Sequence, residues 1–296
     1  MQLEEGTETI SLFSFDLGSS VPDLSGIRIH SGFIVNGSVM FGNLAVKELS
    51  FTSYDCSSEN NIYVRNGQES GNGTYESPYN SIQSAVDDAL MTVDTIQDRV
   101  TIKLFPGEYI LDPGEVITIN KARIDLIGSG QKRTTITGSS AWNCLILDSG
   151  ADSVIQNIKF ECNIYCQNYS RPFFRNVRII NNQSLAGIIA ANGCNVTVVN
   201  CLISDYFMGI SLNDSTCSVS NSTIDSCTGP TGPEDLPDGW PEKWLVVFDG
   251  CGISSSCTPD YAGPTDIIIQ ESIITNCDHG IDISGEINVD LKYSNV

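Results

Sequence analysis

The second half of the chain contains an internal repeat, and this repeat constrains the fold more than any other feature. Five segments align on Asn157, Asn176, Asn200, Asn221 and Glu271. In every segment an apolar residue stands two positions before this anchor, and another stands three positions after it. The anchors are spaced by 19, 24, 21 and 50 residues, the last being about two periods or one period with an inserted loop. Repeats of this length bury their apolar face by stacking on one another.

Each repeat combines short alternating apolar runs with Gly and Asn, which is typical of strands joined by turns. A Gly-Ile pair follows four of the anchors, at residues 187–188, 209–210, 252–253 and 280–281. Leucine-rich repeats have a similar period, but the regular Leu pattern that they need is absent. We therefore predict an all-β fold, a parallel β-solenoid in which the anchor Asn residues form a hydrogen-bonded ladder at a turn.

A helix is predicted just before the first coils. The segment Ser77–Ser81 leads into apolar residues with helical spacing, namely Ile82, Ala85, Val86, Ala89 and Leu90. Further strands are expected at Val100–Tyr109, which ends in a turn, and at Val116–Ile119, Arg123–Ile127 and Thr134–Thr137. The open end of a solenoid core must be covered, and we expect this helix to cap it.

The first 55 residues have a different residue pattern from the repeats. Asn36-Gly37 lies between two short apolar runs within residues 33–41, which predicts a hairpin. We predict three regions: a small β-rich attachment or oligomerisation region at 1–55, a linker and capping helix at 56–98, and a parallel β-helix at 99–296. The β-helix would carry an inserted loop at 228–251.

Several motifs in residues 61–138 resemble those of a known fold family. They are Gly71–Thr74, Ser77–Val86, Pro106–Tyr109, Ile124–Gly130 and Thr135–Gly138. Together they resemble the opening of pectin-lyase-like right-handed parallel β-helices, and the likeness is closest to pectinesterases. At the level of repeat architecture the resemblance extends over residues 61–296. It implies a right-handed parallel β-helix, a fold that virion surface proteins also use.

The resemblance does not extend to the catalytic residues. Pectinesterases use two Asp on neighbouring coils with an Arg and Gln donors, and their pattern places a Gln-Asp pair one or two coils after Gly138. This sequence has Phe160–Asn163 and Cys166–Asn168 there. An alternative catalytic cluster consists of Glu161, Asp205 and Asp225, which fall four or five residues after their anchors, near Arg178. As an enzyme, the chain would need these groups to converge within about 5 to 10 Å in one groove.

The inserted loop is the one irregular feature within the repeats. Residues 229–244 contain four Pro, together with Trp240 and Trp244, which are two of the three Trp in the chain. Long loops on a rigid scaffold often carry function, and Trp side chains stack on sugars or anchor protein interfaces. Binding through Trp240 and Trp244 is one hypothesis, and packing of both rings against the coil is the other.

Charge excludes two classes of partner. The chain has 36 acidic and 15 basic residues, a net charge of −21, so binding to nucleic acid or to anionic lipid is disfavoured. Residues 179–296 contain 15 acidic and two basic side chains, a net charge of −13, which would oppose the approach of an acidic polysaccharide. Arg171, Arg175 and Arg178 form the last positive cluster, and we predict that an acidic partner would dock there.

No cofactor or metal is predicted. The chain has 11 Cys but no C-x-x-C pair and two His, so a zinc site is not expected. We interpret most Cys as small buried apolar residues, with at least one unpaired. Neither a signal peptide nor a membrane-spanning segment is expected from the acidic start and the short apolar runs.

These observations favour a non-enzymatic structural or adhesive β-helix protein, a component of a virion such as a minor capsid, vertex, tail or spike protein, or of a cell-surface assembly. Its expected partners are other proteins of that assembly, with glycans as an alternative, and a homo-oligomer is left open. The competing hypotheses are a carbohydrate-active enzyme, acting as a lyase, hydrolase or esterase, and a glycan-binding module. Because sites and not folds define function, the fold does not choose among them.

Overall fold

The computed structural model describes residues 39–41, 44–46, 61–67, 69–92, 99–120, 122–138, 143–229, 250–257, 266–285 and 287–296. The chain divides into two units, Met1–Ser58 and Glu59–Val296. In the first unit, β1 (Val39–Phe41) pairs antiparallel with β2 (Leu44–Val46). The hairpin predicted around Asn36-Gly37 falls on residues outside the described ones, and the described pair comes a few residues later.

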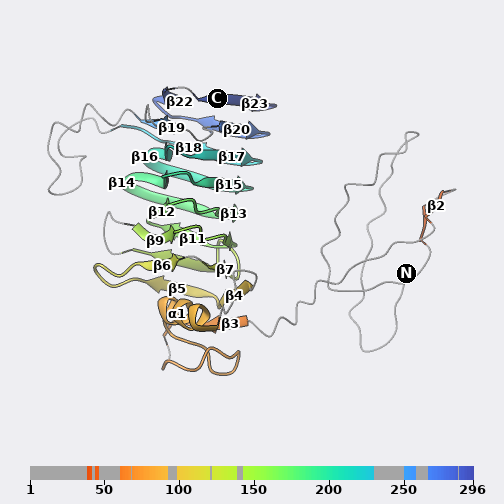
Figure 1. The fold of residues 1–296 in the computed structure, drawn as a ribbon, viewed down its shortest axis with the longest axis vertical. Coiled ribbons are helices and arrows are strands. Elements are labelled where there is room, and N and C mark those ends of the chain that lie inside the picture. The colour runs from red at the N-terminus through yellow and green to blue at the C-terminus, as the bar shows by residue number, and fades with distance from the viewer. Residues whose placement is uncertain are drawn as a thin grey trace. The chain divides into compact units, whose positions relative to one another are not determined.

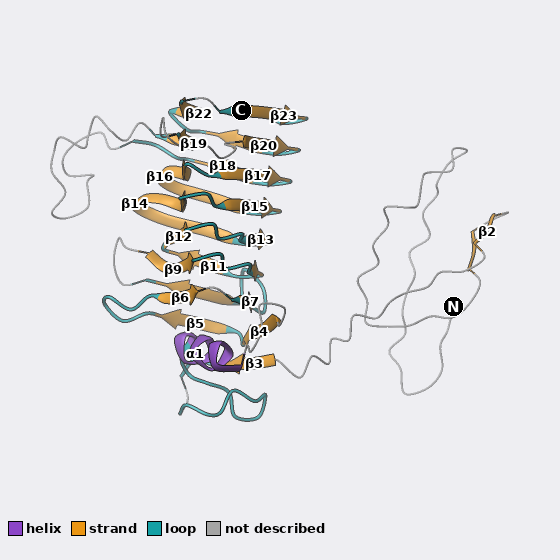
Figure 2. Cartoon of the chain, viewed as in Figure 1, coloured by secondary structure: helices purple, strands orange, loops and turns teal. Residues whose placement is uncertain are grey.

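The second unit is a stack of parallel strands (Figures 1 and 2). Its first sheet contains nine strands: β3 (Asn61–Val64), β4 (Arg99–Leu104), β7 (Arg123–Ile127), β10 (Val154–Gln156), β13 (Phe173–Arg175), β15 (Asn195–Val199), β17 (Thr216–Ser220), β20 (Asp266–Gln270) and β23 (Asn288–Lys292). Strands predicted at Arg123–Ile127 and Thr134–Thr137 have these bounds in the structure.

The second sheet has a main path and a branch. The main path contains β5 (Gly107–Ile110), β8 (Thr134–Thr137), β11 (Lys159–Glu161), β14 (Arg178–Ala191), β16 (Leu202–Asn213), β18 (Thr223–Asp225) and β21 (Ile273–Thr275). The branch contains β6 (Ile117–Asn120), β9 (Asn143–Asp148), β12 (Asn163–Gln167), β19 (Cys251–Ser256) and β22 (His279–Ser284), and the ends of β14 and β16 continue it. Strands of the first sheet, the main path and the branch follow one another along the chain, so one such round is a coil.

The repeat read from the sequence is the repeat of the structure. The residues two positions before each anchor pair in register in the first sheet, and all are buried: Ile155, Phe174, Val198, Val219 and Ile269. The residues three positions after pair in register in the main path, and all are buried: Phe160, Ile179, Ile203, Ile224 and Ile274. Because β18 pairs directly with β21, the 50-residue spacing is one period with inserted residues, not two periods.

Glycine is required where neighbouring coils approach most closely. A Cβ atom placed on Gly209 would lie 2.4 Å from Cγ2 of Ile224 and 2.5 Å from the carbonyl oxygen of Gly252 on the next coil. Such distances are impossible for a real side chain, so the Gly-Ile pairs mark points where a strand packs tightly against the next coil. The Ile of each pair, from Ile188 to Ile281, stacks in register along the branch.

The predicted helix is α1 (Ile82–Thr92), which lies beside β3 at the end of the stack opposite the C-terminus (Figure 1). The hydroxyl of Ser81 accepts a hydrogen bond from the backbone N–H of Ser84, and this bond satisfies one donor of the first turn. Ile82, Ala85, Val86 and Ala89 are buried in the same core as the strands, which confirms the apolar face read from the sequence.

The last coil has a different environment. β22 and β23 are largely exposed, including the apolar side chains of Ile283, Val289 and Leu291. Tyr293 and Val296 after them are also exposed. The strands of the middle coils, in contrast, bury every second residue, so the apolar core of the second unit lies between α1 and β21.

The cysteines lie mainly inside the stack. Six of the eight free cysteines that the structure describes are buried, as expected from the sequence. Cys144 and Cys162 form a disulfide between neighbouring coils, with their Cα atoms 5.8 Å apart. Sequence spacing alone could not identify this pair among 11 Cys.

Candidate functional site

The side chains of the anchor residues form a ladder along the corner between the two sheets. Asn157, Asn176, Asn200, Asn221 and Glu271 all have positive φ, between 48° and 60°. Asn tolerates this left-handed conformation better than most residues. The amide of Asn176 donates to Asn157 over 2.5 Å, and the amide of Asn200 donates to Asn176 over 3.4 Å. The predicted Asn ladder is therefore present at Asn157, Asn176 and Asn200.

The three candidate catalytic acids lie along the main path of the second sheet. Phe160, Ile179, Ile203 and Ile224 are in register, so the strands that carry Glu161 and Asp225 are separated by β14 and β16. Three strand steps correspond to about 14 Å. Asp205 follows Ser204, the residue paired with Asp225, and therefore lies on the neighbouring strand. The structure thus brings Asp205 close to Asp225 and separates Glu161 from Asp225.

Each of these acids is engaged by neighbouring side chains. Glu161 forms an ion pair with Lys159 on its own strand and accepts a hydrogen bond of 3.3 Å from the Thr137 hydroxyl. Asp205 accepts a hydrogen bond of 2.8 Å from the hydroxyl of Ser204. Asp225 accepts from Ser226 over 3.1 Å, and from the amide of Asn276 on the next coil over 2.7 Å. These bonds tie the carboxylates to neighbouring side chains of the stack.

The predicted positive cluster is distributed over two sheets. Arg171 precedes β13 and Arg175 ends it, in the first sheet, whereas Arg178 begins β14 in the second. Arg171 and Arg175 are exposed, and Arg175 donates a hydrogen bond of 2.9 Å to Gln156. Nε of Arg178 is buried and has no hydrogen-bond partner among the described residues. Arg178 pairs in register with Lys159, so two positive side chains adjoin on this face.

Trp240 and Trp244 lie outside the described residues, as does most of the inserted loop. The structure describes the two ends of that loop. Gly229 donates a backbone hydrogen bond of 2.8 Å to the carboxylate of Asp278, and the backbone N–H of His279 donates to the carbonyl of Gly250 over 2.8 Å. Both ends of the insertion are therefore bonded to the same turn of the next coil.

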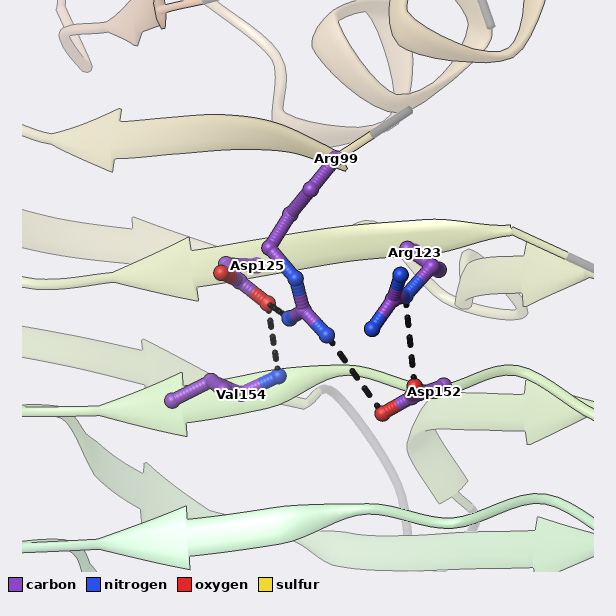
Figure 3. Close-up of polar contacts among 5 residues, drawn as sticks. All are labelled: Arg99, Arg123, Asp125, Asp152 and Val154. Carbon is purple, nitrogen blue, oxygen red and sulfur yellow. Dashed lines mark hydrogen bonds and ion pairs between the residues drawn. The ribbon is translucent and has the colours of Figure 1, made fainter. Parts of the chain in front are cut away.

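A charged quartet on the outer face of the first sheet was not identified from the sequence. It consists of Arg99 on β4, Arg123 and Asp125 on β7, and Asp152 just before β10 (Figure 3). Arg99 forms ion pairs with Asp125 and, over 3.5 Å, with Asp152, and Arg123 pairs with Asp152 over 3.3 Å. Two guanidinium groups thus neutralise two carboxylates across three neighbouring strands.

Within the quartet, the two carboxylates have different environments. Asp125 is only 7% exposed and accepts a hydrogen bond of 2.8 Å from the backbone N–H of Val154. Burial raises the pKa of Asp125 above its usual value, although the Val154 N–H and Arg99 oppose this effect. The side chain of Asp152 is 44% exposed. A buried acid beside a solvated carboxylate is an arrangement that some enzymes use for acid–base catalysis, and it is also an ordinary way to join three strands.

The quartet gave only a weak signal in the sequence. Arg123 and Asp125 are two residues apart in a predicted strand, so their side chains share a face. Arg99 lies 24 residues before Arg123 and Asp152 lies 29 residues after it, and only the register of neighbouring coils brings them together. The predicted register begins at β10, so the pairing of β4 with β7 and of β7 with β10 was not predicted.

No group of three or more His, Cys, Asp or Glu side chains that could hold a metal ion occurs among the residues that the structure describes. Likewise, none of the helices in the described part of the chain is long and apolar enough to cross a membrane.

Comparisons with known proteins show similarity to solved structures only. No protein-family model matches the chain, and no curated protein matches it. A pectin methylesterase in complex with a hexasaccharide is similar at 13% identity and a TM-score of 0.43, over 76% of this chain and 66% of the enzyme. Pectin methylesterase PemA from Erwinia chrysanthemi is similar at 12% identity and a TM-score of 0.41, over 75% of this chain and 80% of the enzyme.

A viral protein is similar at a comparable level. ORF18 of Geobacillus virus E2 matches at 12% identity and a TM-score of 0.34, over 79% of this chain and 60% of that protein. Pectin methylesterases are the group that the sequence of residues 61–138 resembles. Identities and TM-scores this low carry no residue roles.

Proposed function

We propose that this chain is a non-enzymatic structural or adhesive β-helix protein that serves within a larger assembly. The observation that carries the proposal is that polar side chains bond consecutive coils to one another. Asp225 is bonded to Asn276 of the next coil, and Asn176 is bonded to Asn157 of the preceding one. Side chains that hold consecutive coils in register serve the rigidity of the stack, and such rigidity suits a load-bearing or display element.

The finer architecture belongs to the same proposal. We infer that the second unit is a right-handed solenoid and that α1 caps its first coil. Parallel strands of one sheet that are joined by a crossover are right-handed in about 98% of cases, and every described strand pair of residues 59–296 is parallel. The burial of Ile82, Val86 and Ala89 against the first strands supports the role of α1 as a cap.

The assembly that we propose is a particle surface, and a virion is its first candidate. Support comes from the separation of Glu161 from Asp225 and from the inserted loop at 228–251, which a rigid stack would present at one position. The partners would be other proteins of the assembly, with glycans as a second class that Trp240 and Trp244 could bind. Arg171 and Arg175 are exposed and available to an acidic partner.

Two experiments test this proposal. Purified protein is incubated with neutral and acidic polysaccharides, and the products are separated by chromatography; we expect no cleavage and no release of ester groups. Activity that disappears in Asp205→Ala or Asp225→Ala would overturn the proposal. Particles purified from the source are then analysed by mass spectrometry, and we expect the chain at constant stoichiometry with other particle proteins.

The quartet favours a carbohydrate-active enzyme as the second candidate function. Asp125 is buried with a raised pKa, which suits a general acid, and the more exposed Asp152 would be the base or nucleophile. The same polysaccharide assay tests it with Asp125→Asn and Asp152→Asn. Cleavage that is lost in both variants while the fold is retained would establish this function instead of the structural one.

A further inference from the structure

Two cysteines are stacked at the base of the inserted loop. Asp225 on β18 and Thr275 on β21 are in register, and each is followed two residues later by a cysteine, Cys227 and Cys277. The backbone continues the pairing past the strands, because Ser226 donates to Thr275 over 3.1 Å and Asp278 donates to Cys227 over 3.4 Å. Neighbouring strands lie about 4.8 Å apart, within the range of about 4.4 to 6.8 Å between the Cα atoms of a disulfide.

The two thiols face glycines that stand at equivalent positions of consecutive coils, Gly209 and Gly252. A Cβ atom placed on Gly209 would lie 3.2 Å from Sγ of Cys227, and one placed on Gly252 would lie 3.6 Å from Sγ of Cys277. The absence of side chains at these glycines leaves space for the sulfur atoms. Both thiols therefore lie on the same side of their coils, where neighbouring side chains do not separate them.

The two thiols differ in access and acidity. Cys227 is fully buried, whereas Cys277 is partly exposed. A hydrogen bond between the two thiols lowers the pKa of Cys277 to about 7, against the effects of burial and of the nearby Asp225 and Asp278. The same hydrogen bond, together with burial, raises the pKa of Cys227. An accessible thiolate beside a buried thiol is the arrangement found where one cysteine attacks a disulfide and the second cysteine then attacks the mixed disulfide that forms.

We propose that Cys227 and Cys277 are an oxidisable dithiol, a modification site at which a small disulfide such as glutathione disulfide forms an intramolecular Cys227–Cys277 bond. The Cys277 thiolate attacks one sulfur of the oxidant, which forms a mixed disulfide and releases one glutathione thiolate. Cys227 gives up its proton and attacks the Cys277 sulfur, which releases the second glutathione. The two cysteines lose two electrons in total, and one glutathione disulfide is reduced to two glutathione molecules.

The bond would fix the base of the insertion. Cys227 is followed by Thr228 and Gly229, and the carboxylate of Asp278, next to Cys277, already accepts the backbone hydrogen bond of Gly229. Gly250, at the other end of the insertion, accepts from His279 of the same turn. Oxidation would add a covalent link between consecutive coils to this set of hydrogen bonds, so the loop would be presented from a fixed base.

The test is peptide mapping of the full-length protein after exposure to glutathione disulfide, with free thiols alkylated and no reductant added. We expect a peptide pair joined through Cys227 and Cys277 and the loss of both residues from the alkylated set. In the Cys227→Ala variant the reaction should stop at a stable mixed disulfide between Cys277 and glutathione. Cys217→Ala is the matched control, because Cys217 is a buried free cysteine on β17 of the first sheet, and it should leave the Cys227–Cys277 bond unchanged.

A thermal unfolding curve gives a second readout. Oxidised wild type should unfold at a higher temperature than reduced wild type, and the shift should be absent in Cys277→Ser, whose side chain is partly exposed and tolerates the change. A stable mixed disulfide in the wild type, a bond from Cys277 to any other cysteine, or two thiols that remain fully alkylated would each overturn the proposal.

Discussion

The side-chain amide of Asn176 donates a hydrogen bond of 2.5 Å to the side-chain oxygen of Asn157, one coil earlier, and both residues have positive φ. One residue type thus satisfies two requirements at this corner. Its backbone enters the left-handed region at low cost, and its amide continues a ladder that also receives a hydrogen bond from Gln131.

Two substitutions at Asn176 separate these contributions. Asn176→Ala loses the ladder and adds backbone strain of about 1 to 2 kcal/mol. Asn176→Gly loses the same ladder bonds without that strain, although it gains chain entropy in the unfolded state. We therefore expect Asn176→Ala to lower the free energy of unfolding more than Asn176→Gly in a urea titration. Equal losses would show that the backbone strain of alanine does not exceed the entropy cost of glycine at this position.

A second ladder lies inside the stack and leads to a prediction at Ser222. Its hydroxyl donates to the carbonyl of Ser220 over 2.7 Å and accepts from the backbone N–H of Cys201 over 3.1 Å. Ser272 repeats the arrangement one coil later, accepting from the N–H of Ser222. Ser222→Ala would leave the buried N–H of Cys201 without this acceptor, at a cost of about 1 to 3 kcal/mol. Chemical denaturation checks this value.

A matched control for that variant is Ser226→Ala. The Ser226 hydroxyl bonds the carboxylate of Asp225 and lies in a more exposed turn. We expect it to cost less than Ser222→Ala, and the reverse order would contradict a structural role for the inner ladder.

Close packing of the coils predicts that Gly209 tolerates no side chain. A methyl group there would overlap Ile224 and the Gly252 carbonyl, and relief requires a shift of the backbone of the next coil. Overpacking of this kind costs about 1 to 3 kcal/mol or more. Gly107→Ala is the control, since the nearest atom to its Cβ, on Tyr109, would be 4.0 Å away. Calorimetry should show a lower unfolding temperature than wild type for Gly209→Ala and an unchanged one for Gly107→Ala.

The shifted pKa values of Asp125 and Asp148 predict opposite effects of pH on stability. Burial raises the pKa of Asp125, so the folded state binds its proton more tightly than the unfolded state. The stability that this group contributes is therefore full below its ordinary value and is lost as the pH rises through the raised pKa. Asp125→Asn keeps an oxygen to accept the Val154 N–H and should remove this loss.

Asp148 should behave in the opposite way. Burial opposes ionisation there, but hydrogen bonds from Asn168, Ser149 and Gln167 outweigh it and lower the pKa. Its contribution is present above the ordinary value and is lost as the pH falls toward the lowered pKa. Denaturation midpoints measured across the acidic range for Asp125→Asn and Asp148→Asn should differ from wild type with opposite slopes. Parallel curves would contradict these assignments.

Much of the fold was predictable because it is encoded locally. The alternation around Ile155 and Phe160 recurs at each anchor, and the helical spacing of Ile82 to Ala89 is visible in the sequence alone. What could not be predicted depends on register between coils. The division of the second sheet into a path and a branch and the disulfide between Cys144 and Cys162 both require knowing which residues of consecutive coils adjoin.

The candidate sites show the same limit. The acids Glu161 and Asp225 were grouped by their offset from the anchors, which fixes the face of the sheet, although the order of the anchors already places two repeats between them. The quartet was missed for the converse reason, since Arg99 and Asp152 lie far from Asp125 in sequence and meet it only through the pairing of β4, β7 and β10.

The side-chain ladders give this protein a simple rule for changing its length. Asn157, Asn176 and Asn200 offer each neighbour the same amide, so a coil added or removed between them would meet matching donors and acceptors at both joints. Every such step would extend or shorten the stack by about 4.8 Å. The inserted loop, carried by one coil, would then be displayed at a height above the base that is counted in whole repeats.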